Sequence, residues 1–259
     1  MNNIDFKITI DGEQWSKKQI ERLEYERNLH VLHQMNRHGI VIKDGDKELT
    51  GDDIDCLSME KAWEISINTR LLYTGEEIVK YYKESLERSD KFWRELPFGQ
   101  ELPMEVSYCD LSVDGVTLDE YMEMMMGLQV DERNGLAAHP EHFTAIMSDE
   151  KIIGIEPFGM YGTPTLCQVQ FADVEDLGEK IKSDRDPEYP VSMAGRAYLT
   201  DGVTEINCPY HQFKPRENGF DAKLAVYWPE GTPKEIVSGH CLHLAMEFYQ
   251  GLRQVKKGE

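Results

Sequence analysis

The sequence predicts an α+β protein, in which a mostly helical first part precedes an antiparallel sheet and a long C-terminal helix. Through most of residues 1–102, charged and apolar residues alternate at three- and four-residue spacing, as in amphipathic helices. After Pro103, short runs rich in Val, Ile, Tyr and Phe are bounded by turn residues, which is typical of strands. We therefore expect two domains, residues 1–102 and residues 103–259.

Each expected element rests on its own pattern of residues. The helical pattern covers residues 16–39, 58–72 and 75–97. The strand pattern recurs within residues 150–159, 165–178, 195–213 and 219–231, and an apolar helix follows over residues 238–252. An antiparallel sheet closed by a long C-terminal helix would enclose a pocket, so we expect a helix-grip (Bet v 1-like) fold for the second domain.

Composition narrows the class of partner. The 259 residues carry a formal net charge of −20, with 48 acidic against 28 basic residues, which opposes binding to nucleic acid or to an anionic membrane. The five cysteines are widely spaced, which argues against a disulfide framework. No signal peptide or transmembrane stretch is evident, so a cytoplasmic location is expected. The expected partner is a small molecule or another subunit, with a homodimer as a possible assembly.

The terminal helix carries the first chemical signal. His243 and Glu247 are four residues apart, so both lie on one helical face and can reach a common point. Their neighbours Leu244, Met246 and Phe248 are apolar, which indicates that the pair points into the protein. A buried carboxylate needs a partner. A hydrogen-bonded structural pair is the common explanation for such spacing, and a metal site is the alternative.

Other polar residues also occur in apolar surroundings. Glu156 follows a run of Ile and Gly that predicts a buried strand, and His139 and His142 occur in the segment "AAHPEHF". His211 lies in a predicted strand, where a bond to backbone would also account for it. Two imidazoles and two carboxylates form a mixed donor set that suits Zn²⁺ or another divalent first-row metal. The run "YMEMMMG", which includes Met125, is typical of core packing, although Met also suits flat aromatic ligands.

The order of these segments resembles a known family. The segments "LAAHPEHFTAI", "IIGIEPFG", "LCQVQFADVEDLG", "YHQF", "GFDAKLAVYW" and "HLAMEFYQGL" look like successive motifs of the 2,4-diacetylphloroglucinol hydrolase and phloretin hydrolase family, over residues 118–252. The resemblance implies a zinc-dependent hydrolase that cleaves the carbon–carbon bond between an acyl group and a phloroglucinol ring. It also implies a helix-grip domain preceded by a smaller N-terminal domain, and a metal site made of His139, Glu156, His243 and Glu247.

The chemistry of such a cleavage suggests roles for further residues. An aryl carbanion is a prohibitive leaving group, but a phloroglucinol ring can tautomerise to a keto form and accept a proton before the bond breaks. Zinc can polarise the acyl oxygen and lower the pKa of water. We expect His211 and Glu156 to be catalytic. The substrate, an aromatic ketone, is expected to contact the residues His142, Tyr210, Tyr227 and Met125.

Two other functional classes remain open at this point. In the first, the protein is a non-catalytic carrier of a hydrophobic ligand, and His243 and Glu247 only form a hydrogen bond with each other. In the second, it is a non-haem iron oxygenase that uses two His and one carboxylate. Metal content separates the carrier from the hydrolase, and activity without oxygen counts against the oxygenase.

Overall fold

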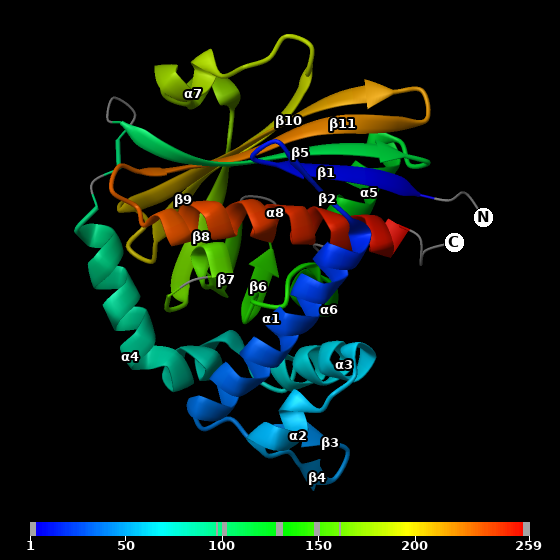
Figure 1. Ribbon diagram of the computed structural model, residues 1–259. Helices are drawn as coiled ribbons and strands as arrows, with labels where there is room; N and C mark the ends of the chain where they lie inside the picture. Colours follow the sequence, from blue (N-terminus) through cyan, green and yellow to red (C-terminus); the bar gives the residue numbers. More distant parts are fainter. Residues whose placement is uncertain are drawn as a thin grey trace.

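A nine-stranded antiparallel sheet forms the centre of the protein, in the order β2-β1-β5-β11-β10-β9-β8-β7-β6 (Figure 1). The structure is a computed structural model that describes residues 4–96, 98–99, 103–127, 132–147, 151–160 and 162–255. The strands of the sheet are β1 (Asp5–Ile10), β2 (Glu13–Trp15), β5 (Met104–Asp114), β6 (Thr144–Met147), β7 (Lys151–Glu156), β8 (Thr165–Ala172), β9 (Val191–Leu199), β10 (Glu205–Arg216) and β11 (Gly219–Pro229).

The C-terminal helix α8 (Lys234–Val255) lies along one face of this sheet (Figure 1). Apolar side chains of α8, among them Leu244, Met246 and Phe248, are buried in a core shared with Leu224 and Val226 of β11. Burial of apolar surface is the main favourable contribution to folding, so this layer holds helix and sheet together. Helix α5 (Leu118–Gly127) packs against the same helix.

The helices of the N-terminal part form a layer below α8 and the end of the sheet (Figure 1). They are α1 (Lys17–Arg37), α2 (Gly51–Asp55), α3 (Met59–Arg70) and α4 (Gly75–Arg94), with the small hairpin of β3 (Lys43–Asp44) and β4 (Lys47–Glu48). Ser16 and Thr74 begin α1 and α4 with capping boxes, which satisfy backbone N–H groups of the first turn. The core of this layer includes Phe143 and Ile155, which flank the polar residues described below.

The opposite face of the sheet is covered by a smaller layer. It contains α7 (Glu179–Ser183) and the short 3-10 helix η3 (Val174–Asp176). Ile181 of α7 is buried there with Tyr210 and Tyr227 of the sheet. Helix α6 (Glu132–Ala138) and the 3-10 helix η2 (Phe158–Met160) are the remaining elements of the described residues, and both adjoin α8.

The predicted fold class is confirmed at the level of an α+β protein with a large antiparallel sheet and a C-terminal helix. The helices between Lys17 and Arg94 agree with a mostly helical N-terminal part, but β1 and β2 extend the main sheet. The division at residues 102 and 103 adjoins residues 100–102, outside the described residues, and stays a prediction. Over the described part of the chain, no helix combines the length and apolar character needed to cross a membrane.

Candidate metal centre and pocket

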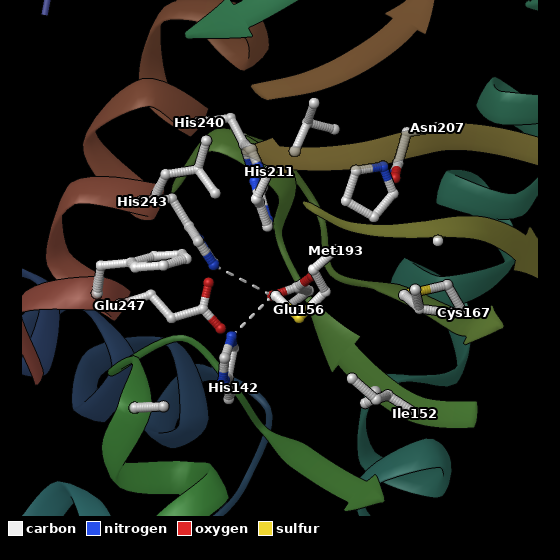
Figure 2. Close-up of a pocket in the computed structure, with 18 of the residues that line it drawn as sticks. His142, Ile152, Glu156, Cys167, Met193, Asn207, His211, His240, His243 and Glu247 are labelled. Carbon is white, nitrogen blue, oxygen red and sulfur yellow. Dashed lines mark ion pairs between the residues drawn. The ribbon is translucent and has the colours of Figure 1, made fainter. Parts of the chain in front are cut away.

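Three separate segments bring polar side chains to one place between α8 and the sheet. The turn after α6 carries His139 and His142, β7 ends at Glu156, and α8 carries His243 and Glu247. Figure 2 shows Glu156, His142, His243 and Glu247 pointing toward one another from these elements. The three imidazoles of His139, His142 and His243 offer ligand atoms within 4.8 Å of one another, close enough to bind a metal ion.

Glu156 lies at the centre of this cluster. Its Oε2 atom is 3.0 Å from Nε2 of His142 and 3.5 Å from Nε2 of His243. The same oxygen is buried without a well-aligned hydrogen bond. Donor atoms that bind one zinc ion at about 2.1 Å lie no more than about 4.2 Å apart. The two nitrogens and the carboxylate oxygen are therefore close enough to share an ion after small movements.

The hydrogen bond of His142 fixes which of its nitrogens faces the cluster. Nδ1 of His142 lies 3.2 Å from the backbone oxygen of Gly135. A carbonyl oxygen can only accept, so Nδ1 carries a proton, and Nε2 is the nitrogen that faces Glu156. Histidine ligands of metals usually have this arrangement, in which the second nitrogen donates to a carbonyl or carboxylate.

His139 has the opposite arrangement. Its Nδ1 atom accepts a hydrogen bond of 3.1 Å from the backbone N–H of Glu141, so the neutral ring carries its proton on Nε2. That Nε2 atom is buried and has no hydrogen-bond partner. The ring stacks on His243 with centroids 3.7 Å apart. His139 could bind an ion through Nε2 only after its proton moved to Nδ1 and the bond to Glu141 was lost.

The two carboxylates have opposite pKa shifts. Burial alone would raise the pKa of Glu156, but the adjacent His142 and His243 outweigh it and lower that pKa. For Glu247, burial outweighs the attraction of His142, and with the neighbouring charge of Glu156 it raises the pKa. Burial also lowers the pKa of His243 well below its usual value, so its ring is neutral and can act as a ligand. A cation would relieve the repulsion between the two carboxylates.

Two glycines allow the turn after Glu156 to approach α8. Gly159 in η2 has φ +67°, and a Cβ atom there would lie 2.1 Å from the backbone oxygen of Ile236. A Cβ atom on Gly239 of α8 would lie 1.7 Å from the backbone oxygen of Gly159. Only glycine fits such close contacts between backbones. The approach brings the end of β7, and with it Glu156, beside the helix that carries His243.

A cavity of about 340 Å³ opens from this cluster toward the sheet. Its volume falls at the lower end of the range for small-molecule sites, roughly 300 to 1,000 Å³. No Lys or Arg occurs among the described residues that line it. Most of the lining is apolar and comes from Met122, Met125, Ile152, Phe158, Val169, Met193, Pro209, Val226, Leu244 and Phe248.

A second polar group lines the same cavity. It consists of Asn207 and His211 on β10 and His240 on α8 (Figure 2). Burial lowers the pKa of His211 to about 4 and that of His240 to about 3, so both rings are neutral at neutral pH. Neutral imidazoles and an amide can donate and accept hydrogen bonds, which suits hydroxyl or carbonyl groups of a ligand.

The structure places some predicted contact residues in the cavity and others outside it. His142, His211 and Met125 line the cavity, together with Glu156, His243 and Glu247. Tyr210 and Tyr227 lie in the core on the opposite face of the sheet, and the Tyr227 hydroxyl donates to Asp184. Side chains alternate between the two faces of a strand, so Tyr210 cannot share a face with His211. The prediction that these two tyrosines contact the substrate is corrected accordingly.

Several residues of the site did not emerge as candidates from the sequence. Spacing alone could have indicated His240, since it is one helical turn from His243. Asn207 shares a strand face with His211, which is four residues further along β10. Arg27 and Arg70 contact the turn that carries His139 and His142, but they lie far away in sequence and without any local signal.

A scan against models of protein families found no match, and a search of curated proteins found none either. Among solved structures, the chain is similar to protein Ms6760 from Mycobacterium smegmatis at 12% sequence identity, with a TM-score of 0.28. That likeness covers 60% of this chain and 94% of the other.

Proposed function

We propose that this protein is a metal-dependent hydrolase that cleaves the carbon–carbon bond between an acyl group and a phloroglucinol-type ring. Phloretin and acetylated phloroglucinols represent the substrate class, and zinc is the proposed metal. The motif order of residues 118–252 supports the reaction class. We also propose a helix-grip fold for residues 103–259, which is supported by α8 lying along the sheet with a cavity between them.

One observation carries the proposal. Two partly buried carboxylates, Glu156 and Glu247, line a cavity that has no Lys or Arg among its described lining residues, and the His243 ring beside them is neutral. Buried like charges are costly unless a cation compensates them. A divalent ion would provide this compensation, and nitrogen and oxygen donors together suit zinc.

The imidazoles of His142 and His243 and the carboxylates of Glu156 and Glu247 form the proposed donor set. His142 is preferred to His139 because its Nε2 atom faces Glu156 while its Nδ1 atom donates to the backbone, whereas His139 uses its Nδ1 lone pair to accept from Glu141. The variants His142→Ala and His139→Ala test this choice. We expect the first to lose most of its metal and the second to retain more. The reverse order would assign the second imidazole to His139.

The proposed reaction is a hydrolysis. Water adds to the acyl carbon, the bond between that carbon and the ring carbon breaks, and the products are a phloroglucinol and a carboxylic acid. A bound divalent ion would supply charge stabilisation at the acyl oxygen. His211, His240 and Asn207 would hydrogen-bond to ring hydroxyls and hold the ring for the tautomerisation in which a hydroxyl proton moves to the ring carbon. The apolar wall would hold the ring and exclude water.

Metal content and activity under nitrogen test this function directly. Elemental analysis of the purified protein should find a first-row divalent metal, and incubation with phloretin or diacetylated phloroglucinol should release phloroglucinols and carboxylic acids. Removal of the metal by a chelator should abolish the activity, and zinc should restore it. An oxygen requirement would favour the oxygenase alternative. Binding of an aromatic ketone by a metal-free, inactive protein would favour the carrier alternative.

A substrate with a changed phenolic ring provides the most direct control. A ketone with the same acyl chain but only one phenolic hydroxyl cannot tautomerise in the same way, although its carbonyl is equally available. We expect this ketone to bind without being cleaved. Efficient cleavage of it would contradict ring protonation before bond breakage.

A further inference from the structure

Two arginines of the N-terminal helices, Arg27 and Arg70, donate hydrogen bonds to the turn that carries His139 and His142. Arg70, the last residue of α3, is buried, with 1% of its surface exposed. Its Nη1 group donates to the backbone oxygens of Leu136 (2.9 Å), His139 (3.1 Å) and His142 (2.7 Å). Its Nε group donates to the backbone oxygen of Ser66 within α3.

These three carbonyls belong to the end of α6 and the turn that follows it. The last carbonyls of a helix lack partners within the helix, and a buried carbonyl without a partner is costly. A cation at a helix C-terminus also interacts favourably with the helix dipole. The Arg70 guanidinium therefore determines how α6 ends and where the chain turns toward the cavity.

The orientation of His142 depends on the same helix end. Its Nδ1 atom donates to the backbone oxygen of Gly135, one residue before Leu136. Arg70 donates to the backbone oxygens of both Leu136 and His142. It therefore holds the helix end that contains the acceptor, Gly135, and also the backbone of the donor, His142. The result is that Nε2 of His142 lies 3.0 Å from Glu156.

A second arginine holds the same turn. Arg27 on α1 donates through Nε and Nη2 to Oε1 of Glu141, and the Nε distance is 3.0 Å. Glu141 lies between His139 and His142 and is fully buried. The cations of α1 and α3 thus contact the turn on which His142 lines the cavity.

We propose that Arg70 is a positioning residue for the metal centre, and that the N-terminal helices are required for metal affinity because they hold this turn. The proposal rests on the metal site proposed above. Partners that orient metal ligands from outside the ligand set typically contribute about tenfold to a hundredfold to affinity. Arg70→Met, which removes every donor, should lower metal affinity by that factor.

The experiment measures metal affinity per folded protein for three variants of the full chain. Arg70→Lys keeps the positive charge on a shorter donor group and should fall between the wild type and Arg70→Met. Arg216→Met is the control, since Arg216 also donates to backbone oxygens, those of Val113 and Phe220, but not to this turn. Affinity is measured for Zn²⁺ by competition with a chromophoric chelator, and the visible spectrum of the Co²⁺ form reports ligand geometry.

The possible outcomes distinguish a failure of this proposal from a failure of the proposed function. Reduced affinity and an altered Co²⁺ spectrum in Arg70→Met, with neither change in Arg216→Met, would support it. Wild-type affinity in a folded Arg70→Met would overturn it while leaving the metal site intact. If Arg70→Met does not fold, Arg70→Lys decides, and wild-type affinity and spectrum in that variant would overturn the proposal. A wild-type protein that binds no metal would instead overturn the proposed function, and this inference with it.

Discussion

Glu156 and Glu247 differ in the interactions that stabilise their charged forms. Glu156 has two imidazoles within 3.5 Å of one oxygen, and they lower its pKa despite burial. The pKa of Glu247 is raised, because burial and the charge of Glu156 outweigh His142. A bound cation would stabilise the charged form of Glu247 more than that of Glu156. The pKa of Glu247 should therefore change more when the metal is removed.

Glu247→Gln keeps the shape of the side chain and removes its charge. We expect metal affinity to fall by more than about tenfold and turnover to be nearly abolished, since even partners outside the ligand set contribute that much. The fold should persist, because most of the buried contacts of α8 are apolar. Metal titration and circular dichroism check both expectations. Glu235→Gln, an exposed position on the same helix, is the control. Unchanged metal content and activity in Glu247→Gln would remove Glu247 from the site.

His211 has a different expected effect, because it lines the cavity on the β10 side, with Asn207 (Figure 2). His211→Ala should lower turnover far more than metal content if the ring orients or protonates the substrate. Tyr210→Phe is a matched control, because the adjacent residue faces the other side of the sheet. Steady-state kinetics and elemental analysis of both variants provide the measurement. Equal loss of metal and turnover in His211→Ala would indicate a structural role.

Among the elements, the contact between α8 and η2 determines the distance between Glu156 and His243. Gly159 and Gly239 permit an approach that a side chain would prevent. On the other side, Thr165 of β8, which pairs with Glu156, accepts a hydrogen bond of 2.9 Å from Trp93 of α4. The end of β7 is therefore held between α8 and the N-terminal layer.

Gly239→Ala tests this contact. A Cβ atom there would lie 1.7 Å from the backbone oxygen of Gly159, so the turn or the helix must move. We expect a loss of stability on the order of 1 to 3 kcal/mol, as for other overpacked sites, together with reduced metal affinity. Ser238→Ala, on the exposed side of α8, is the control. Denaturant unfolding and metal titration check the two effects, and unchanged values in both would contradict the proposed close approach.

At the scale of the whole molecule, buried histidines make stability depend on pH. Burial lowers the pKa of His211 to about 4, whereas in the unfolded chain it returns to an ordinary value of about 6.5. Between these values the unfolded state binds more protons than the folded state, so stability falls as pH falls. Burial also lowers the pKa values of His139, His240 and His243.

His211 should therefore destabilise the metal-free protein at pH 5 relative to pH 7.5, whereas Glu141, whose pKa burial raises to about 7, contributes with the opposite sign. The contribution of His211 at pH 5 is roughly 2 kcal/mol. Urea unfolding of wild type and His211→Phe at both pH values measures it, and the variant should lose less stability on acidification. The same pH dependence in both proteins would show that His211 does not contribute. His142, whose pKa is raised because Glu156 outweighs burial, contributes with the opposite sign.

Much of the fold and part of the site were predictable from the sequence. Periodicity and turn residues predicted the main helices and strands, because these patterns reflect local backbone geometry. The i, i+4 spacing placed His243 and Glu247 on one face of α8 for the same reason. Strand periodicity excludes Tyr210 as a neighbour of His211, whereas residue type alone favours both Tyr210 and Tyr227 as substrate contacts.

Only the tertiary structure decided which distant residues meet. It brought the turn after α6, the end of β7 and α8 together, and it placed Arg70 on the carbonyls of that turn. It also turned Nε2 of His142 toward Glu156 and gave Nδ1 of His139 a hydrogen bond, through backbone contacts that residue types do not reveal. Spacing along the chain determines which side chains share one face of a helix or strand, whereas packing between elements determines which residues that face contacts.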